Sequence, residues 1–351
     1  MSYMPEIVKL VDKITGVASA ENKKSGFFIG NTTKIDQEGL YITPLRNNSL
    51  MVTGGVIVYN ENQAVEITKV VDGRVDYILV DAEKKIPPDL SLDGVLGNIE
   101  VEVRKYIRKS KLWVYKGNDL SVDAVDILLT QLTNRSRRGI GGGKVAILGA
   151  GNLGSKLALR LVERGALVTI TRRNQSTLET IVNAINFIKP KYTEAQVIGM
   201  LSNEHAARNA NILIGATPGI AVIDTNIINN LGDQALIIDA GKGTITEDAI
   251  GLAAERDFLV FRLDITSALE GLMYQLLGVE KNFEKNIGRK RLHDENIVSG
   301  GLIGKVDEIV VDSVWCPRTI YGISDGKGDF VRKLSRSQLM RLEKFNTLIF
   351  K

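Results

Sequence analysis

The chain has 351 residues and a formal net charge of +4, and 44% of its residues are hydrophobic and 25% are charged. This composition is typical of a globular protein and excludes collagen, a coiled coil or general disorder as a description of the whole chain. Since a domain usually holds about 100 to 200 residues, the length predicts two domains by default. The single cysteine, Cys316, excludes an intramolecular disulfide, and two histidines leave little for a zinc site, so we predict no metal.

Charge and hydropathy patterns also bear on location and partners. The sequence contains no apolar run of about 18 residues, the length that crosses a bilayer. Its first residues, MSYMPEIVKLVDKI, carry charges and lack the apolar core of a signal peptide, so we expect a cytoplasmic protein without membrane contact. The mild positive charge permits an anionic ligand but does not argue for nucleic acid. A nucleic-acid partner bound through RSRR and RKYIRK is a third and weaker hypothesis.

The predicted elements follow two different patterns along the chain. In residues 25–138, the β-branched runs GGVIVYN, AVEITKVV and DYILVDA predict short strands. Residues 119–132 predict a helix, because their apolar side chains recur at helical spacing (Val122, Val125, Leu128, Leu129 and Leu132). Residues 139–270 alternate amphipathic stretches with the strand-like runs KVAILGAG, LVTITRR, ANILIGAT and ALIIDAG. This alternation predicts a parallel sheet that is covered on both faces.

We therefore predict an α/β protein with three parts. An N-terminal α/β catalytic or substrate domain spans residues 1–138, and a Rossmann domain with a doubly wound parallel sheet spans residues 139–280. Residues 281–351 form a C-terminal extension that packs back or supports a homodimer, and they include the strand-like run DEIVVDSVW. Cys316, between Trp315 and Pro317, is expected to be a packed apolar residue, with a reactive thiolate as the alternative.

The sequence GAGNLG has the glycine spacing of a dinucleotide-binding turn. The apolar strand KVAIL precedes it and the amphipathic helix SKLALRLVERG follows it, which is the context that the motif requires. The start of such a helix offers free N–H groups and a partial positive charge to phosphates. The predicted cofactor residues of this turn are Gly149, Gly151, Asn152, Leu153 and Gly154. A strand-to-helix turn without a ligand is the alternative.

The end of the next predicted strand bears on the choice of cofactor. An NAD site usually has an acidic residue about 20 residues after the glycines, but this chain has Thr171, Arg172 and Arg173 there. Two guanidinium groups can bind a 2′-phosphate, whereas a carboxylate would repel it. We therefore predict NADP(H) in preference to NAD(H), with a solvated arginine pair as the alternative.

A lysine and several carboxylates precede the glycine turn. The strand DYILVDA leads into Lys84 and Lys85, and the helix of residues 119–132 carries Asp119, Asp123 and Asp126. A lysine held beside a carboxylate can transfer protons, because each group changes the charge state of the other. A surface charge cluster is the alternative. Asp239, at the end of ALIIDAG, is either a further site residue or a turn-forming aspartate.

The order and spacing of these motifs resemble the shikimate dehydrogenase superfamily, which has relatives in the glutamyl-tRNA reductase group. VDAEKK stands where that family ends a strand with a lysine, and SVDAVD stands where it has an Asn-Thr-Asp-Gly motif. The resemblance implies that Lys85, or else Lys84, and Asp123 are the catalytic pair. It also implies that TRRN receives the NADP phosphate and that a loop lies along the cofactor (Ala216, Thr217 and Pro218). GLMYQ resembles the family's glycine, methionine and glutamine helix, which implies that Gln275 faces the substrate.

The chain also departs from that family. The segment GFFIGNTTKIDQEG lacks the Ser-x-Ser pair that holds the carboxylate of shikimate, so shikimate is not the expected substrate. We predict an NADP(H)-dependent dehydrogenase or reductase that transfers hydride to or from a small polar, carboxylated alcohol or ketone. One alternative is an amino-acid dehydrogenase or imine reductase of biosynthetic metabolism, and another is a non-catalytic dinucleotide-binding protein.

Overall fold

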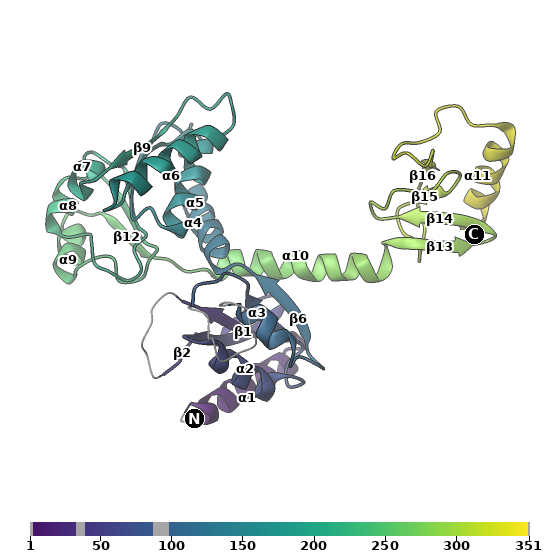
Figure 1. The fold of residues 1–351 in the computed structure, drawn as a ribbon, viewed down its shortest axis with the longest axis horizontal. Coiled ribbons are helices and arrows are strands. Elements are labelled where there is room, and N and C mark those ends of the chain that lie inside the picture. Colours follow the sequence, from purple (N-terminus) through teal and green to yellow (C-terminus); the bar gives the residue numbers. More distant parts are fainter. Residues whose placement is uncertain (1–2, 33–38, 87–97, 350–351) are drawn as a thin grey trace. The chain divides into compact units, whose positions relative to one another are not determined.

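The computed structural model describes residues 3–32, 39–86 and 98–349. Residues 33–38 of the segment GFFIGNTTKIDQEG lie outside the described residues. The chain forms two compact units, Met1–Gly271 and Leu272–Lys351. The first unit contains two largely parallel sheets, which confirms the predicted α/β fold class (Figure 1). None of the helices in the described residues is long and apolar enough to cross a membrane.

The N-terminal sheet has the strand order β2-β4-β1-β5-β6, and β3 pairs with β4. Its parallel strands are β1 (Lys24–Asn31), β4 (Met51–Val58), β5 (Tyr77–Asp81) and β6 (Lys111–Tyr115). Two short strands run antiparallel to β4, namely β2 (Tyr41–Ile42) and β3 (Arg46–Asn47). The helices of this region are α1 (Met4–Ala20), α2 (Glu61–Val71), α3 (Ile99–Arg104) and α4 (Gly117–Thr133). The carboxyl ends of the parallel strands therefore bring Asn31, Asp81 and Tyr115 to one edge of the sheet.

The prediction of a strand for AVEITKVV is wrong, because these residues belong to α2. The Asn60 side chain caps this helix by accepting a hydrogen bond from the backbone N–H of Gln63. Ala64, Ile67 and Val71 then recur at helical spacing and are fully buried in the hydrophobic core. The β-branched composition favoured a strand, but the cap and the spacing of the buried residues stabilise a helix.

The second sheet is parallel throughout and has the order β12-β11-β10-β7-β8-β9. Its strands are β7 (Lys144–Leu148), β8 (Leu167–Thr171), β9 (Val197–Met200), β10 (Ile212–Gly215), β11 (Leu236–Asp239) and β12 (Leu259–Arg262). Its helices are α5 (Asn152–Glu163), α6 (Gln175–Ile188), α7 (Asn203–Ala207), α8 (Thr225–Asn229) and α9 (Glu247–Glu255). This is the strand order of a Rossmann domain, as predicted. The order reverses between β7 and β10, and ligands of such sheets bind at that point, beyond the carboxyl ends of the strands.

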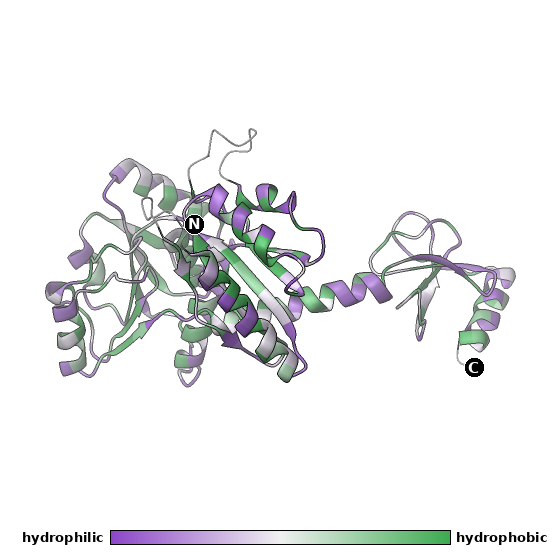
Figure 2. Cartoon of the chain, turned by 90° about the horizontal axis from the view of Figure 1, so that it is seen from below, coloured by the Kyte–Doolittle hydropathy of each residue, from purple (hydrophilic) through white to green (hydrophobic). Residues whose placement is uncertain are grey.

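The second unit contains most of helix α10, a small sheet and helix α11. Helix α10 (Thr266–Lys285) passes through the boundary between the units and alternates between hydrophobic and hydrophilic residues (Figure 2). The sheet has the order β13-β14-β15-β16 and is followed by α11 (Arg336–Ile349). Its strands are β13 (Gly288–Leu292), β14 (Glu295–Ser299), β15 (Ile309–Val311) and β16 (Ile320–Ile323).

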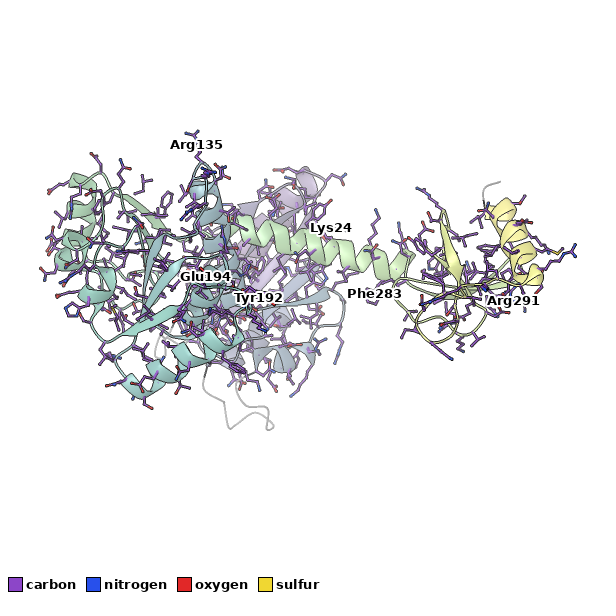
Figure 3. All side chains as sticks on the ribbon, turned by 90° about the horizontal axis from the view of Figure 1, so that it is seen from above. Lys24, Arg135, Tyr192, Glu194, Phe283 and Arg291 are labelled. Atoms are coloured by element: carbon purple, nitrogen blue, oxygen red, sulfur yellow. The ribbon has the colours of Figure 1, made fainter. Side chains whose placement is uncertain are left out.

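The second unit has its own hydrophobic core, formed by Ile297, Ile309, Val311, Val314 and Phe345. Cys316 lies outside this core and is exposed, so the prediction that it is packed is wrong. Phe283 of α10 is also exposed (Figure 3). Such singly exposed apolar side chains are common on protein surfaces and do not by themselves indicate a binding site.

Candidate functional site

The glycine turn after β7 has the backbone geometry that each of its glycines allows. Gly149 has a φ of +114°, a left-handed conformation that favours glycine. A Cβ added to Gly154 would lie 2.0 Å from the carbonyl oxygen of Gly149, so the helix can approach the turn only without a side chain there. A Cβ added to Gly151 would meet nothing within 4 Å. The open space beside Gly151 is therefore the place where a ligand can approach the backbone.

The start of α5 has the geometry that favours binding of an anion. Gly151 is the N-cap residue and offers no side chain to the first turn, and this turn contains no acidic residue. The first N–H groups of a helix have no partner within the helix, and its dipole places partial positive charge at this end. The first three helical residues, Asn152, Leu153 and Gly154, are thus placed to present backbone donors to a phosphate.

A pocket of about 460 Å³ lies at this end of the Rossmann sheet. Most of the predicted cofactor residues line it (Gly149, Gly151, Thr171, Arg172, Arg173, Ala216, Thr217 and Pro218). The guanidinium of Arg172 donates a hydrogen bond of 2.7 Å to the carbonyl oxygen of Ala150 in the glycine turn. Arg173 is exposed. The structure therefore gathers the glycine turn, the arginine pair and the Ala216–Pro218 loop around one pocket.

The turn after β11 lies against the Ala216–Pro218 loop. Hydrogen bonds to Asp239 hold this turn in its conformation. A Cβ added to Gly241 would lie 1.8 Å from the carbonyl oxygen of Thr217, so the two loops touch through glycine. The buried carboxylate of Asp239 accepts hydrogen bonds from the N–H of Gly243 and from the N–H and hydroxyl of Thr244. Burial raises the pKa of Asp239, but these hydrogen bonds outweigh it and hold the pKa below its ordinary value. Asp239 thus stabilises the conformation of its own turn.

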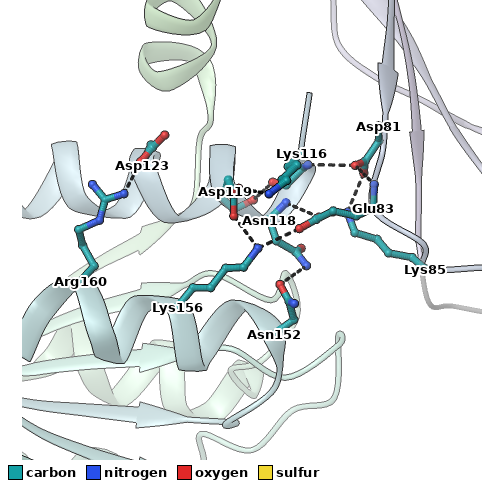
Figure 4. Close-up of polar contacts among 12 residues, drawn as sticks. Asp81, Glu83, Lys85, Lys116, Asn118, Asp119, Asp123, Asn152, Lys156 and Arg160 are labelled. Carbon is teal, nitrogen blue, oxygen red and sulfur yellow. Dashed lines mark hydrogen bonds and ion pairs between the residues drawn. The ribbon is translucent and has the colours of Figure 1, made fainter. Parts of the chain in front are cut away.

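Lys85 lies in a charged cluster at the carboxyl edge of the N-terminal sheet (Figure 4). Its Nζ is 2.7 Å from Oδ2 of Asp81, the last residue of β5, and 2.9 Å from Oε2 of Glu83. A Cβ added to Gly117 would lie 2.8 Å from Nζ of Lys85 and 2.7 Å from Asp81, so the first residue of α4 must be small. Lys84 is exposed, whereas the side chain of Lys85 is 14% exposed. Of the two lysines, Lys85 is the one held by carboxylates.

Glu83 connects this cluster to the Rossmann domain. Its carboxylate accepts a hydrogen bond of 2.8 Å from the backbone N–H of Asn118 and one of 3.1 Å from Nζ of Lys156 on α5. Lys156 also binds Asp119, and the side chain of Asn118 donates to that of Asn152 at 2.9 Å (Figure 4). Burial raises the pKa of Glu83, but the bonds from Asn118, Lys85 and Lys156 outweigh it and lower the pKa overall.

Asp123 has different neighbours from Lys85. It lies one turn after Asp119 on α4, and it pairs with Arg160 of α5 at 3.0 Å (Figure 4). The next acidic residue, Asp126, binds Arg164, so Asp119, Asp123 and Asp126 form successive ion pairs between the two helices. The structure therefore does not bring Lys85 and Asp123 together. The physical reason is the direction of α4, whose first turn meets β5 while its later turns pack along α5.

Gln275 is exposed on α10 and belongs to the second unit, whereas the other predicted site residues belong to the first. Among residues 3–32, 39–86 and 98–349, no three His, Cys, Asp or Glu side chains are grouped in a way that could hold a metal ion.

Several polar residues of the cluster were not predicted from the sequence. They are Asn31, Asp81, Glu83, Tyr115 and Lys156. The side-chain nitrogen of Asn31 donates to the carbonyl oxygen of Glu83 at 2.6 Å, while its buried side-chain oxygen has no hydrogen-bond partner in the described part of the chain. Burial raises the pKa of Tyr115 well above its ordinary value, and the charges of Asp81 and Glu83 raise it further. Asp81 could have been found as the acidic residue near the end of DYILVDA, but the pairing of Glu83 with Lys156 has no signal in the sequence.

The strand order and the glycine turn define a Rossmann domain with a pocket beyond the carboxyl ends of its strands. In agreement, residues 144–243 match the model of a family described as NADP oxidoreductase coenzyme F420-dependent. The match covers the glycine turn, the arginine pair and the Ala216–Pro218 loop. No curated protein matches the chain.

Solved structures with a similar fold include several dehydrogenases. L-tryptophan dehydrogenase from Nostoc punctiforme is 17% identical, covers 67% of this chain and 66% of its own, and has a TM-score of 0.42. Hetero-hexameric glutamate dehydrogenase from Thermus thermophilus is 13% identical, with coverages of 74% and 68% and a TM-score of 0.45. The A chain of dipicolinate synthase from Bacillus subtilis is 14% identical, with coverages of 73% and 79% and a TM-score of 0.37. These values are too low to carry an argument about substrate or activity.

Proposed function

We propose that the protein is an NADP(H)-dependent dehydrogenase or reductase whose substrate is a small polar, carboxylated alcohol or ketone. The observation that carries the proposal is the pocket at the start of α5, where an uncapped helix end and two arginines face one cavity. The matching family, whose description names NADP, and the resemblance of the motifs to the shikimate dehydrogenase superfamily both support it. We assign substrate binding to residues 1–138 and cofactor binding to residues 139–280.

The residues of the pocket fit a dinucleotide with a 2′-phosphate. The open space beside Gly151 admits a pyrophosphate, which the N–H groups of the first turn of α5 would bind. Arg172 is held by the carbonyl oxygen of Ala150, and Arg173 lies exposed beside it, so both can reach a phosphate at the rim. The residues from the end of β8 to the cap of α6, Thr171 to Asn174, include no carboxylate that would repel this group.

Lys85 is the proposed proton donor and acceptor. The bound nicotinamide would supply the hydride, and a proton must accompany it to the substrate oxygen. An ammonium has three N–H donors, of which Asp81 and Glu83 account for two. The third can bind the oxygen of an alcohol or ketone and transfer the proton, while the two carboxylates keep the amine in position. We propose that Asp123 holds α4 against α5 and takes no part in proton transfer.

The first experiment is a titration of the purified protein with NADPH and with NADH, followed by nicotinamide fluorescence. We expect tighter binding of NADPH, and we expect Arg172→Met and Arg173→Met together to remove most of that preference. Arg135→Met is the matched control, because Arg135 is an exposed arginine outside the pocket (Figure 3). If neither NADPH nor NADH binds, the proposed function is overturned. If the double variant loses affinity for both nucleotides to the same extent, the NADP assignment is overturned.

A further inference from the structure

Three basic side chains from separate segments meet at the carboxyl edge of the Rossmann sheet. Arg262 is the last residue of β12 and is the register partner of Asp239 on β11. Lys242 lies in the turn that follows β11, between Gly241 and Gly243. Arg46 comes from β3 of the N-terminal sheet, and its Nε donates a hydrogen bond of 3.3 Å to the hydroxyl of Thr266. Residues 220 positions apart in the sequence are thus joined at this edge.

The carboxylates in this region are already bound. Asp239 accepts hydrogen bonds from its own turn and lies 3.6 Å from Nε of Arg262. Asp264 accepts from the backbone N–H of Thr266 at 3.0 Å and from its hydroxyl at 2.6 Å. Three cations therefore face two carboxylates, and Arg46 and Lys242 are the cations for which no ion pair is found in the described part of the chain. The region retains one net positive charge.

The electrostatics of Lys242 are consistent with this arrangement. Burial lowers the pKa of Lys242, and repulsion from Arg46 and Arg262 lowers it further, while Asp264 and Asp239 offset only part of this. A bound anion would relieve the repulsion. Arg46 lowers the pKa of Tyr115, whereas Asp81 and Glu83 of the Lys85 cluster raise it, so the charges of both groups act on this one phenol.

We propose that Arg46 and Lys242 bind the carboxylate of the substrate, with Arg262 and Asp239 supporting the turn that carries Lys242. One net positive charge matches a monoanionic carboxylate better than a phosphate, which carries up to two charges. A carboxylate held there would lie near Tyr115, on which Arg46 and the carboxylates that bind Lys85 all act. The inference rests on the proposed function, since it concerns the substrate of the same site.

The test uses the full-length protein saturated with NADPH and titrated by calorimetry with pyruvate, a small oxo monocarboxylate, and separately with inorganic phosphate. The variants are Arg46→Met, Lys242→Met and Lys242→Gly. Glycine takes the left-handed conformation of this position (φ +58°) without strain, so the last variant is expected to fold while losing the ammonium. Lys24→Met is the matched control, because Lys24 is an exposed lysine at the start of β1 and already has an ion-pair partner in Asp76 (Figure 3).

We expect pyruvate to bind more tightly than phosphate, and each site variant to weaken pyruvate binding about tenfold or more while the control does not. Pyruvate binding that is absent, or that is unchanged in all three site variants, would overturn the inference. Tighter binding of phosphate than of pyruvate would overturn the carboxylate assignment. The two proposals fail differently: if the wild-type protein does not bind NADPH the proposed function fails, whereas retained NADPH binding with no carboxylate site removes only this inference.

Discussion

The carboxylate of Glu83 lies 3.1 Å from Nζ of Lys156, and this contact joins the substrate side of the proposed site to the cofactor side. Glu83 also binds Lys85, and Lys156 belongs to the helix whose first turn borders the nucleotide pocket. One ion pair therefore lies between the proposed proton-transfer lysine and the proposed phosphate-binding helix end.

Replacement of Lys156 should reveal this link. Lys156→Met leaves Glu83 and Asp119 without their shared cation, and the Glu83 side chain is only 13% exposed. Since Lys156 itself is partly exposed, we expect a loss of about 1 to 2 kcal/mol in the free energy of unfolding. Urea denaturation measures this loss of unfolding free energy. Lys191→Met is the control, because Lys191 is an exposed lysine. Additive effects of Lys156→Met and Glu83→Gln in a double-mutant cycle would show that the contact is energetically unimportant.

The two neighbouring lysines should differ in their effect on catalysis. Lys85→Met removes the proposed proton donor and should lower kcat by about 10² to 10⁴, with the Kd of NADPH little changed. Lys84→Met removes the same charge one position earlier, from an exposed side chain, and should leave kcat unchanged. Turnover is measured with a substrate found by screening carboxylated ketones and alcohols. Similar rates for the wild-type protein and the Lys85 variant would show that Lys85 does not transfer the proton.

Asp123 should contribute to stability and little to turnover. Asp123→Asn breaks an ion pair whose two side chains are 44% and 49% exposed, which is worth about 0.2 to 1 kcal/mol. Chemical denaturation and steady-state rates in the same buffer separate the two effects. A fall in kcat of a hundredfold or more without a loss of stability would restore Asp123 as a member of the catalytic pair.

Alanine substitutions at two glycines of the nucleotide turn should have different effects, one on NADPH binding and the other on stability. Gly151→Ala places a methyl group in open space, so the fold should be kept while NADPH binding weakens by about tenfold or more. Gly154→Ala forces its Cβ against the Gly149 carbonyl oxygen and should lower the free energy of unfolding by about 1 to 3 kcal/mol. Thermal unfolding and fluorescence titration are measured on both variants. Unchanged NADPH affinity in Gly151→Ala would argue that the turn binds no pyrophosphate.

The lowered pKa of Glu83 predicts an acid-dependent contribution to stability. A carboxyl group whose pKa is lower in the folded than in the unfolded state stabilises the fold above the unfolded pKa, here near its ordinary value of 4.5. That stabilisation is lost as the pH falls from there through the folded pKa. The difference in unfolding free energy between the wild-type protein and Glu83→Gln should therefore be largest near neutral pH and shrink below about pH 4.5. A difference that stays constant from pH 7 to pH 3 would contradict this.

Local patterns in the sequence were sufficient for the nucleotide half of the site. The apolar strand, the glycine spacing and the amphipathic helix lie within about 20 consecutive residues, so the backbone geometry of Gly149 and Gly154 follows from short-range sterics. The same local reasoning failed for AVEITKVV, where composition favoured a strand and the cap at Asn60 favoured a helix.

The other half of the site depends on packing between distant segments. The sequence alone determined that a lysine follows β5 and that three aspartates lie on α4, but the tertiary structure decided that Lys85 binds Asp81 and Glu83 while Asp123 binds Arg160. Likewise, nothing in the sequence relates Arg46 to Lys242. Side-chain electrostatics act over a few ångströms, and residues as much as 220 positions apart come within that range only when the two sheets and helices α4 and α5 have packed.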